Sequence, residues 1–295
     1  MPLYCGIGGV KHKISGLYTG AGGVKKELTE IWTAEGGVKK LVYQSNAINP
    51  ILNDNSWDVI RQASDDGVAS SIWAVGDRKA VTLNGKCSKL TFSNETYYVY
   101  ILGFDHNSSI EGTNRIHFQF GYTALSGGVH VAFVSGYRDD SDFYMNSSRT
   151  NANGWKYSFM RNTVCSMFKN CLPSDLQSVM KSVVKYSDNK GGTSNAASNV
   201  TASRDNVFIL SEYEVFGIIN YANSAEKSYQ SQYEYYKKGN SKLRYRHTAL
   251  AYKVFWWLRS VAANSSEYFC NVSDSADQIM TNADYSIGFA PAFCV

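Results

Sequence analysis

The sequence predicts an α+β fold built from many short strands and two helices, preceded by a small β repeat module. Three observations predict it. The 295 residues include 24 Gly and only four Pro, a composition typical of a turn-rich chain with short strands. Short apolar segments alternate with polar turns, and two segments have the apolar spacing of amphipathic helices. A motif also recurs with a constant period over the first 45 residues.

The repeat defines the N-terminal module, residues 1–45. Gly-Gly-Val recurs every 14 residues, with an aromatic residue before each copy and a lysine after it: 8–10, 22–24 and 36–38, with Tyr4, Tyr18 and Trp32, and Lys11, Lys25 and Lys39. Each unit predicts two short strands joined by a glycine turn. One unit cannot bury its apolar face alone, so it must stack on neighbours or on other chains. We expect an anchoring stem that forms a homo-oligomer, with a trimer favoured; the alternative is a plain sheet extension of the main domain.

Residues 46–295 predict one large domain that begins with a polar, turn-rich linker at 46–56. A short helix is expected to start at Trp57, and two amphipathic helices are expected at 157–170 and 175–186. Ser174 and Gln177 predict a capping box for the second of these helices. Residues 187–205 predict a loop, and short strands follow residue 253. Further strands are expected at 72–77, 79–83, 97–103, 116–120, 129–134 and 207–211.

Bulk properties exclude several classes of protein. A net charge of +4 is too small for this length to predict a nucleic-acid partner. No run of eighteen apolar residues occurs, so we expect no membrane insertion. The first residues lack the basic and apolar regions of a signal peptide, and we expect synthesis in the cytoplasm without one. The six cysteines form no CxxC pair and predict free thiols, with a Cys270–Cys294 disulfide as the alternative.

Four blocks of sequence carry a resemblance: 154–161, 205–212, Trp-Trp-Leu-Arg-Ser at 256–260 and Gly-Phe-Ala-Pro-Ala-Phe at 288–293. In this order they resemble a family of uncharacterised domains common in phages and prophages of gut bacteria. That family looks related to the C-type-lectin fold, in the branch shared with formylglycine-generating enzymes and the target proteins of diversity-generating retroelements. The repeats at 1–45 are similar to stems at the start of phage tail proteins.

The resemblance implies a C-type-lectin-like fold, with two helices packed on a small antiparallel sheet and C-terminal strands supporting an exposed loop surface. It implies that the chain is a viral protein, an adhesin located in the phage tail and made in the bacterial cytoplasm. Its partner would be a host-cell surface protein or glycan receptor. Two alternatives remain: a structural tail or decoration protein without a receptor, and a formylglycine-generating type of oxidase.

The stretch 261–287 is the predicted ligand-binding surface. Sixteen of its 27 residues are Ser, Asn, Asp, Thr or Ala. A retroelement that randomises the adenines of AAC codons cannot produce Lys, Glu, Gln, Met or Trp, and only Glu267, Gln278 and Met280 here belong to that set. This favours diversification; the alternative is an ordinary polar loop. The expected exposed ligand-binding positions are Ala262, Ala263, Asn264, Ser265, Ser266, Tyr268, Ser273, Asp274, Ser275, Asp277, Asn282, Asp284 and Tyr285.

The blocks that border this stretch are expected to be its fixed frame. Trp256, Trp257 and Leu258 predict core positions. Arg259 adjoins this apolar run, so it should pair with a buried carboxylate or carbonyl, and Asp205 and Glu212 are the candidate carboxylates.

No metal, cofactor or catalytic activity is expected. The sequence lacks the Glu-Pro-Asn, Gln-Pro-Asp and Trp-Asn-Asp motifs of calcium-dependent lectins, and the acidic segment 139–142 predicts a solvated loop. The contexts of Cys270 and Cys294 do not match an oxidase active site, and His106 is expected at a structural turn. The Tyr- and Lys-rich segment 233–247 could stack on RNA, but an exposed basic loop or an inter-subunit contact is preferred.

Overall fold

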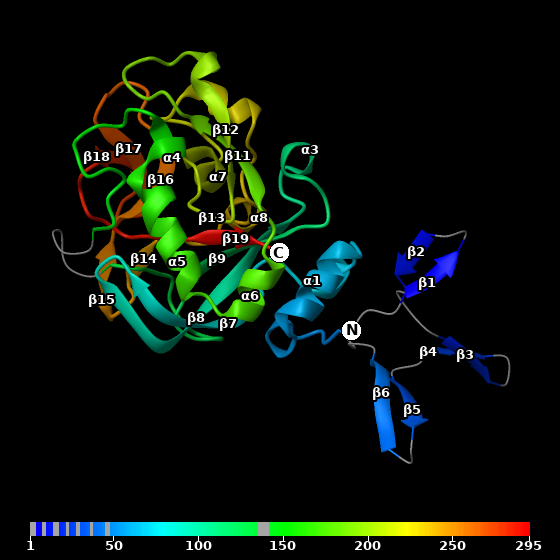
Figure 1. Cartoon of the computed structure of the whole chain (residues 1–295). Helices are drawn as coiled ribbons and strands as arrows, with labels where there is room; N and C mark the ends of the chain where they lie inside the picture. Colours follow the sequence, from blue (N-terminus) through cyan, green and yellow to red (C-terminus); the bar gives the residue numbers. More distant parts are fainter. Residues whose placement is uncertain are drawn as a thin grey trace. The chain divides into compact units, whose positions relative to one another are not determined.

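The computed structural model describes residues 48–134 and 142–295 in full, together with the backbone of six strands between residues 4 and 44. The chain divides into two compact units, Met1–Asn49 and Pro50–Val295. In the first unit, each repeat forms one antiparallel strand pair, as the sequence predicts (Figure 1). The pairs are β1 (Tyr4–Ile7) with β2 (Val10–Lys13), β3 (Tyr18–Ala21) with β4 (Val24–Glu27), and β5 (Glu30–Glu35) with β6 (Val38–Gln44).

The second unit is built on a five-stranded antiparallel sheet in the order β13-β19-β9-β8-β7. The strands are β7 (Arg78–Cys87), β8 (Leu90–Phe104), β9 (Ile116–Tyr122), β13 (Val207–Phe208) and β19 (Ala292–Cys294). β19, drawn in red, lies between β9 and β13 at the centre of the unit (Figure 1). The predicted mixture of helices with an antiparallel sheet is therefore confirmed.

One face of this sheet carries the apolar core. Successive side chains of a strand point to opposite faces, so Phe118 and Phe120 of β9 share this face. Trp57, at the start of α1 (Trp57–Asp65), meets the Phe118 ring edge-on at 5.6 Å between ring centroids. Phe168 of α5 (Cys165–Cys171) meets the Phe120 ring in the same way at 5.1 Å. α1 begins where the sequence predicts because the Ser56 side chain accepts a hydrogen bond from the Val59 amide.

The opposite face of β9 is polar but equally buried. The Gln119 side-chain oxygen accepts hydrogen bonds from the hydroxyls of Tyr100 and Tyr236, at 2.6 and 2.7 Å. Arg244 donates to two backbone oxygens beside it, those of Phe120 and Val131. Glycine at residue 121 leaves room for this side chain, because a Cβ there would lie 2.5 Å from the Arg244 guanidinium and would force it to shift.

This second face corrects the prediction of an exposed basic loop at 233–247. Tyr233, Tyr235 and Tyr236, on and beside α8 (Glu234–Lys237), are buried, as is Arg244. Their hydroxyls find partners inside the domain, which makes burial of these rings favourable. The three rings are therefore unavailable for stacking on nucleic-acid bases.

The first predicted helix, 157–170, is confirmed: a π-helical turn at Met160–Val164 (η2) continues directly into α5, and the short α4 (Gly154–Tyr157) precedes it. The second predicted helix is shorter than expected. The second, α6 (Ser174–Val179), ends where Met180 adopts an extended backbone. The expected capping box does not form: Pro173 is the N-cap residue and Gln177 donates to the Leu172 carbonyl.

Residues beyond α6 form a strand pair, which corrects both the long second helix and the loop at 187–205. β11 (Val183–Asp188) pairs antiparallel with β12 (Val200–Asp205). The β-branched Val183 and Val184 favour a strand once a partner strand is present. Residues 72–77 are not a strand: they include the end of α2 (Ala69–Ile72) and a turn.

The remaining strands form two three-stranded sheets. One contains β10 (Val131–Ala132), β14 (Arg244–Arg246) and β15 (Ala249–Val254); the other contains β16 (Trp256–Val261), β17 (Tyr268–Val272) and β18 (Gln278–Asn282). Cys270 and Cys294 are both free thiols, so the alternative disulfide is wrong. The other short helices are α3 (Ser108–Glu111), α7 (Glu212–Phe216), η1 (Leu52–Asp54), η3 (Ala197–Asn199) and η4 (Ser224–Ser228). Among the described residues, no helix is long and apolar enough to cross a membrane.

We predict that Phe118→Ala lowers the free energy of unfolding by about 3–5 kcal/mol, because the fully buried ring contacts Trp57 and Phe293. Urea unfolding followed by circular dichroism measures the change. Leu125→Ala is the control, since Leu125 is 43% exposed and its truncation should cost less than about 0.5 kcal/mol. Equal losses of unfolding free energy in the two variants would contradict the placement of Phe118 in the core.

Candidate binding face and buried charge network

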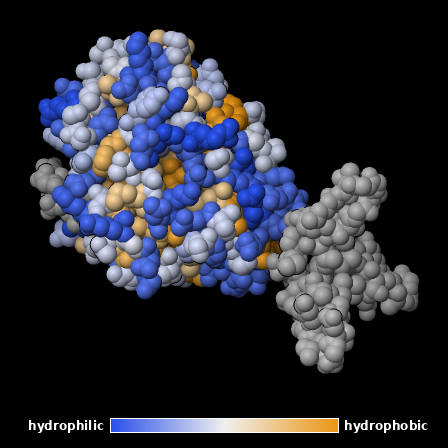
Figure 2. Space-filling view, in the orientation of Figure 1, coloured by the Kyte–Doolittle hydropathy of each residue, from blue (hydrophilic) through white to orange (hydrophobic). Residues whose placement is uncertain are grey.

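An open groove of about 670 Å³ lies on the described surface. This volume lies within the usual range of small-ligand sites, about 300–1,000 Å³. Two carboxylates, three aromatic rings, two hydroxyls and one aliphatic side chain line it: Asp142, Tyr144, Phe255, Thr281, Asp284, Tyr285, Ser286 and Ile287. Elsewhere, on the face in view, apolar residues form small patches on a mostly hydrophilic surface (Figure 2).

The structure brings only two of the thirteen predicted ligand-binding residues, Asp284 and Tyr285, into the groove lining. Most of the others are solvent-accessible on the surrounding loops. The exposed positions are Asn264, Ser266, Asp274, Ser275, Asp277 and Tyr285. The half-buried positions are Ala263, Ser265, Tyr268, Asn282 and Asp284.

Ala262 and Ser273 are buried, so the prediction that they are exposed is wrong. The Ala262 amide donates to the Tyr268 carbonyl, which places it inside the sheet. The Ser273 hydroxyl accepts hydrogen bonds from the amides of Ser275 and Asp277, so it closes the turn before β18. Both side chains are small. Composition alone therefore does not distinguish a buried Ala or Ser from one that is exposed for ligand contact.

Sequence reasoning missed the groove residues that come from outside 261–287. Asp142 and Tyr144 reach it because the segment at Phe143 binds the chain at 286–287: the Phe143 amide donates to the Ser286 hydroxyl, and the Ile287 amide lies 3.4 Å from the Phe143 carbonyl. These contacts join residues more than 140 positions apart in the sequence, so local sequence patterns do not predict them. Phe255 was detectable only as an apolar residue next to the Trp-Trp-Leu-Arg-Ser block.

Both groove carboxylates have a weakly held cation on the surface. Lys89 lies 3.2 Å from Asp142, and Arg149 lies 4.0 Å from Asp284. The side chains of Lys89 and Arg149 are about half exposed, at 53% and 51%, and such pairs typically stabilise by about 0–1 kcal/mol. Of the acidic segment 139–142, only Asp142 lies within the described residues.

The apolar part of the frame is confirmed: Trp256, Trp257 and Leu258 are fully buried in β16. The Trp257 indole donates to the Phe143 carbonyl at 2.7 Å, which fixes the segment that carries Asp142 and Tyr144. The framing strand is therefore attached directly to one wall of the groove.

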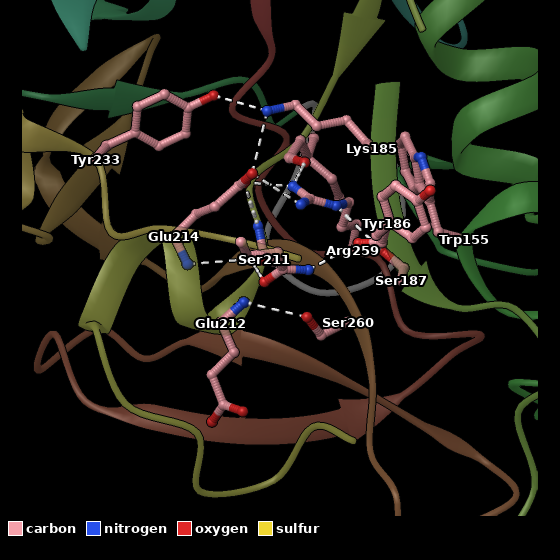
Figure 3. Close-up of polar contacts among 12 residues, drawn as sticks. Trp155, Lys185, Tyr186, Ser187, Ser211, Glu212, Glu214, Tyr233, Arg259 and Ser260 are labelled. Carbon is pink, nitrogen blue, oxygen red and sulfur yellow. Dashed lines mark hydrogen bonds and ion pairs between the residues drawn. The ribbon is translucent and has the colours of Figure 1, made fainter. Parts of the chain in front are cut away.

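Arg259 pairs with a buried carboxylate as predicted, but the partner is Glu214 of α7, neither Asp205 nor Glu212 (Figure 3). Its guanidinium makes two hydrogen bonds to the two Glu214 oxygens, one of them 2.8 Å long. It also donates to the Ser187 hydroxyl of β11 at 3.0 Å. The predicted candidates have other roles: Asp205 binds Arg161, and Glu212 accepts backbone amides of residues 220–222.

Lys185 of β11 extends this network to a second carboxylate. Its ammonium lies 2.8 Å from Glu111 and 3.1 Å from Glu214, and it donates to the Tyr233 hydroxyl at 2.9 Å (Figure 3 shows the Glu214 and Tyr233 contacts). Burial by itself would raise the pKa of Glu214, but Arg259 and Lys185 outweigh it and hold this pKa well below its usual value. Burial raises the pKa of Glu111 to about 7, although Lys185 opposes the rise.

In the buried cluster around Glu111 and Glu214, the Lys185 ammonium already occupies the place of a cation. Among the described residues, His106, Glu111 and Glu214 have ligand atoms close enough to hold a metal ion. The Lys185 ammonium, however, contacts both carboxylates, and burial together with Lys185 lowers the pKa of His106 to about 3. His106 stacks on Tyr233 at 3.6 Å between ring centroids. We interpret the cluster as a structural junction between α3, α7, β11 and β16, closed to solvent.

Arg259→Met should lower the free energy of unfolding by about 3–5 kcal/mol, because it leaves the buried Glu214 charge without its main partner. Thermal and urea unfolding measure the loss. Arg61→Met is the matched control: its partner Asp65 is 40% exposed, so the change leaves no buried charge unpaired and should cost clearly less. Equal losses of stability in the two variants would contradict the conclusion that the buried Arg259–Glu214 pair contributes more to stability than an exposed pair.

Glu226 gives the network a pH dependence. Burial raises its pKa to about 7, despite hydrogen bonds from Ser260, Gln230 and the Asp188 amide. Because the folded pKa exceeds the unfolded one, protonated Glu226 stabilises the fold at low pH, and this stabilisation is lost as the pH rises through 7. The unfolding free energy of Glu226→Gln, measured relative to that of the natural chain, should therefore rise by about 2 kcal/mol as the pH increases from 5 to 8. A pH-independent difference in unfolding free energy would refute this.

Comparison with known protein families shows a match over the C-terminal part of the chain. Residues 137–295 match the family model described as a domain of unknown function (DUF6273). No curated protein and no solved structure matches the chain. The matched region contains the whole groove, together with Lys185, Glu214 and Arg259, whereas Glu111 and strands β7 to β9 precede it. Since the match covers more than half of the 295 residues, the chain belongs to the DUF6273 family.

Proposed function

We propose that this chain is a receptor-binding protein of a phage tail or phage surface, whose C-terminal face binds a ligand on the host cell. The observation that carries the proposal is the groove at 281–287, surrounded by small polar residues on loops that rigid, buried strands support. Binding surfaces commonly consist of adaptable loop residues on a fixed scaffold.

The fold that we propose for residues 46–295 is C-type-lectin-like. Helices cover the apolar face of an antiparallel sheet, and the strand β19 near the C-terminus lies inside that sheet. The stretch 261–287 forms β17, β18 and their loops beside this core. These features support the proposal because they match the arrangement that the sequence resemblance implies.

We further propose that 261–287 is diversified by a retroelement. Eleven of the thirteen candidate positions are exposed or half-buried, so most substitutions there would leave the core unchanged. The frame residues at 256–259 and 288–293 are all buried, where substitutions are costly. Variation without loss of the fold is therefore physically feasible.

An enzymatic role of the formylglycine-generating type has little support. Cys270 and Cys294 are fully buried, and burial raises the pKa of both thiols, that of Cys294 to about 11. Thiolates are the reactive form of cysteine, so these environments are unfavourable for oxidase chemistry. A structural tail or decoration protein stays as the second candidate, since the stem at 1–45 fits either role.

Binding to cells separates the receptor-binding role from the decoration role. We expect the labelled chain to bind saturably to at least one strain in a panel of gut bacteria, as measured by flow cytometry. Asn264→Lys with Ser275→Lys should weaken this binding, because long charged side chains would obstruct the exposed loops. Lys237→Ser at an exposed position of α8 is the control. Failure to bind any strain would favour the decoration protein.

Diversification predicts a distinct pattern of natural variation. Sequencing of the gene across a phage population should show substitutions concentrated at the eleven accessible positions of 261–287, in AAC-type codons. The buried codons 256–260 and 288–293 serve as the internal control. Equal substitution rates in the two groups would count against a retroelement.

We propose that residues 1–45 assemble the chain into a homo-oligomer, with a trimer favoured. The three strand pairs each form a two-stranded sheet, and such isolated hairpins are only marginally stable in water. Stacking on copies from other chains would stabilise them. Deletion of 1–45 should therefore convert the oligomer to a monomer in light scattering, and an unchanged mass would refute the role of the stem.

A further inference from the structure

We propose that the groove binds a cationic side chain, lysine or arginine, of a partner protein. The proposal rests on the proposed binding function of this face and names the chemistry of its ligand. The groove lining that the structure describes contains two carboxylates, Asp142 and Asp284, but no Lys, Arg or His. The cations that pair with these carboxylates, Lys89 and Arg149, are not among the described lining residues, and their side chains are about half exposed.

Aromatic rings complete a site for a cation. Tyr144, Phe255 and Tyr285 line the same groove as the two carboxylates, and Tyr285 is 49% exposed. The face of an aromatic ring attracts an ammonium or guanidinium, by about 0.5–2 kcal/mol depending on its desolvation. Rings combined with carboxylates favour a cation more strongly than they favour a neutral ligand.

The carboxylate of Asp284 is weakly held within the protein. Its Oδ1 atom lies 4.0 Å from the Arg149 Nε atom, which is beyond hydrogen-bonding distance, and within the described part of the chain this oxygen accepts no hydrogen bond. Oδ1 itself is inaccessible to solvent, but the Asp284 side chain as a whole is 34% exposed, so a ligand in the groove would approach it from its accessible side. Lysine and arginine supply several donors and no acceptor, which suits such a carboxylate.

Lys89 and Arg149 would compete with the ligand for the two carboxylates. Their side chains are about half exposed and free to turn into solvent, so displacement costs little. The competition predicts an effect of opposite sign: removal of Arg149 should strengthen binding, whereas removal of Asp284 should weaken it. A neutral glycan, the other class of ligand for an aromatic groove, would not respond in this way.

The test uses the complete chain with fluorescein-labelled pentalysine, followed by fluorescence anisotropy. We expect Asp142→Asn and Asp284→Asn each to weaken binding about tenfold. Tyr285→Ala should weaken it about threefold, whereas Tyr285→Phe should leave it unchanged. Arg149→Gln should strengthen it. Asp274→Asn is the matched control, because Asp274 is an exposed acid of the same stretch outside the groove lining. Thermal unfolding verifies that each variant is folded.

Three results would overturn the inference. If Asp274→Asn weakens binding as much as Asp284→Asn, pentalysine senses only the surface charge. If a neutral glucose oligosaccharide binds in a Tyr285-dependent manner and pentalysine does not, the groove is a glycan site. The proposed function is tested separately. If pentalysine binds with these variant effects but the chain binds no bacterial strain, the groove chemistry is supported and the receptor role is refuted. Cell binding that is unchanged in Asp142→Asn/Asp284→Asn would remove the inference and keep the function.

Discussion

The buried pair of Arg259 and Glu214 is the interaction on which the C-terminal half of the domain depends. Arg259 belongs to the framing strand β16, Glu214 to α7, and the pair is extended by Ser187 and Lys185 of β11. A buried charge without its partner costs several kcal/mol, so these elements must meet in one arrangement. Glu214 also accepts the Ser211 amide in the capping box of α7, which ties the helix start to the same junction. The network thus fixes the strand from which the binding face extends.

Within one short part of the chain, the buried residues stabilise the fold and the accessible residues are available for binding. The stretch 261–287 begins at the last residue of β16, Val261, and Gly288 directly after it pairs with Trp256, so both ends of the stretch are attached to β16. Between these attachments the accessible side chains are mostly small and polar. Substitution of such residues changes the chemistry of the surface at little cost in stability. A face of this kind suits a protein that must change its ligand, and the groove supplies a site within it for a charged anchor.

Errors in the sequence-based predictions have particular physical causes. The apolar spacing of 175–186 fits a helix, but Val183 and Val184 pair with the strand at 200–205, because β-branched residues have a lower helix propensity and favour a strand when a partner strand is present. The segment 233–247 has the composition of an exposed loop, yet Tyr233, Tyr235 and Tyr236 are buried because side chains of β9 provide partners for their hydroxyls. In both cases a contact distant in sequence decided between two local possibilities.

The sequence by itself determined the mixed helical and antiparallel architecture, the strand pairs of the repeats, the buried tryptophans and the need of Arg259 for a buried carboxylate. These features follow from periodicity, composition and the cost of burying charge, which are local properties of the chain. Only the tertiary structure selected Glu214 as the partner, buried Ala262 and Ser273, and brought Asp142 and Tyr144 beside Asp284 and Tyr285. The reason is that such contacts join segments far apart in the chain, and their geometry exists only after the strands have paired.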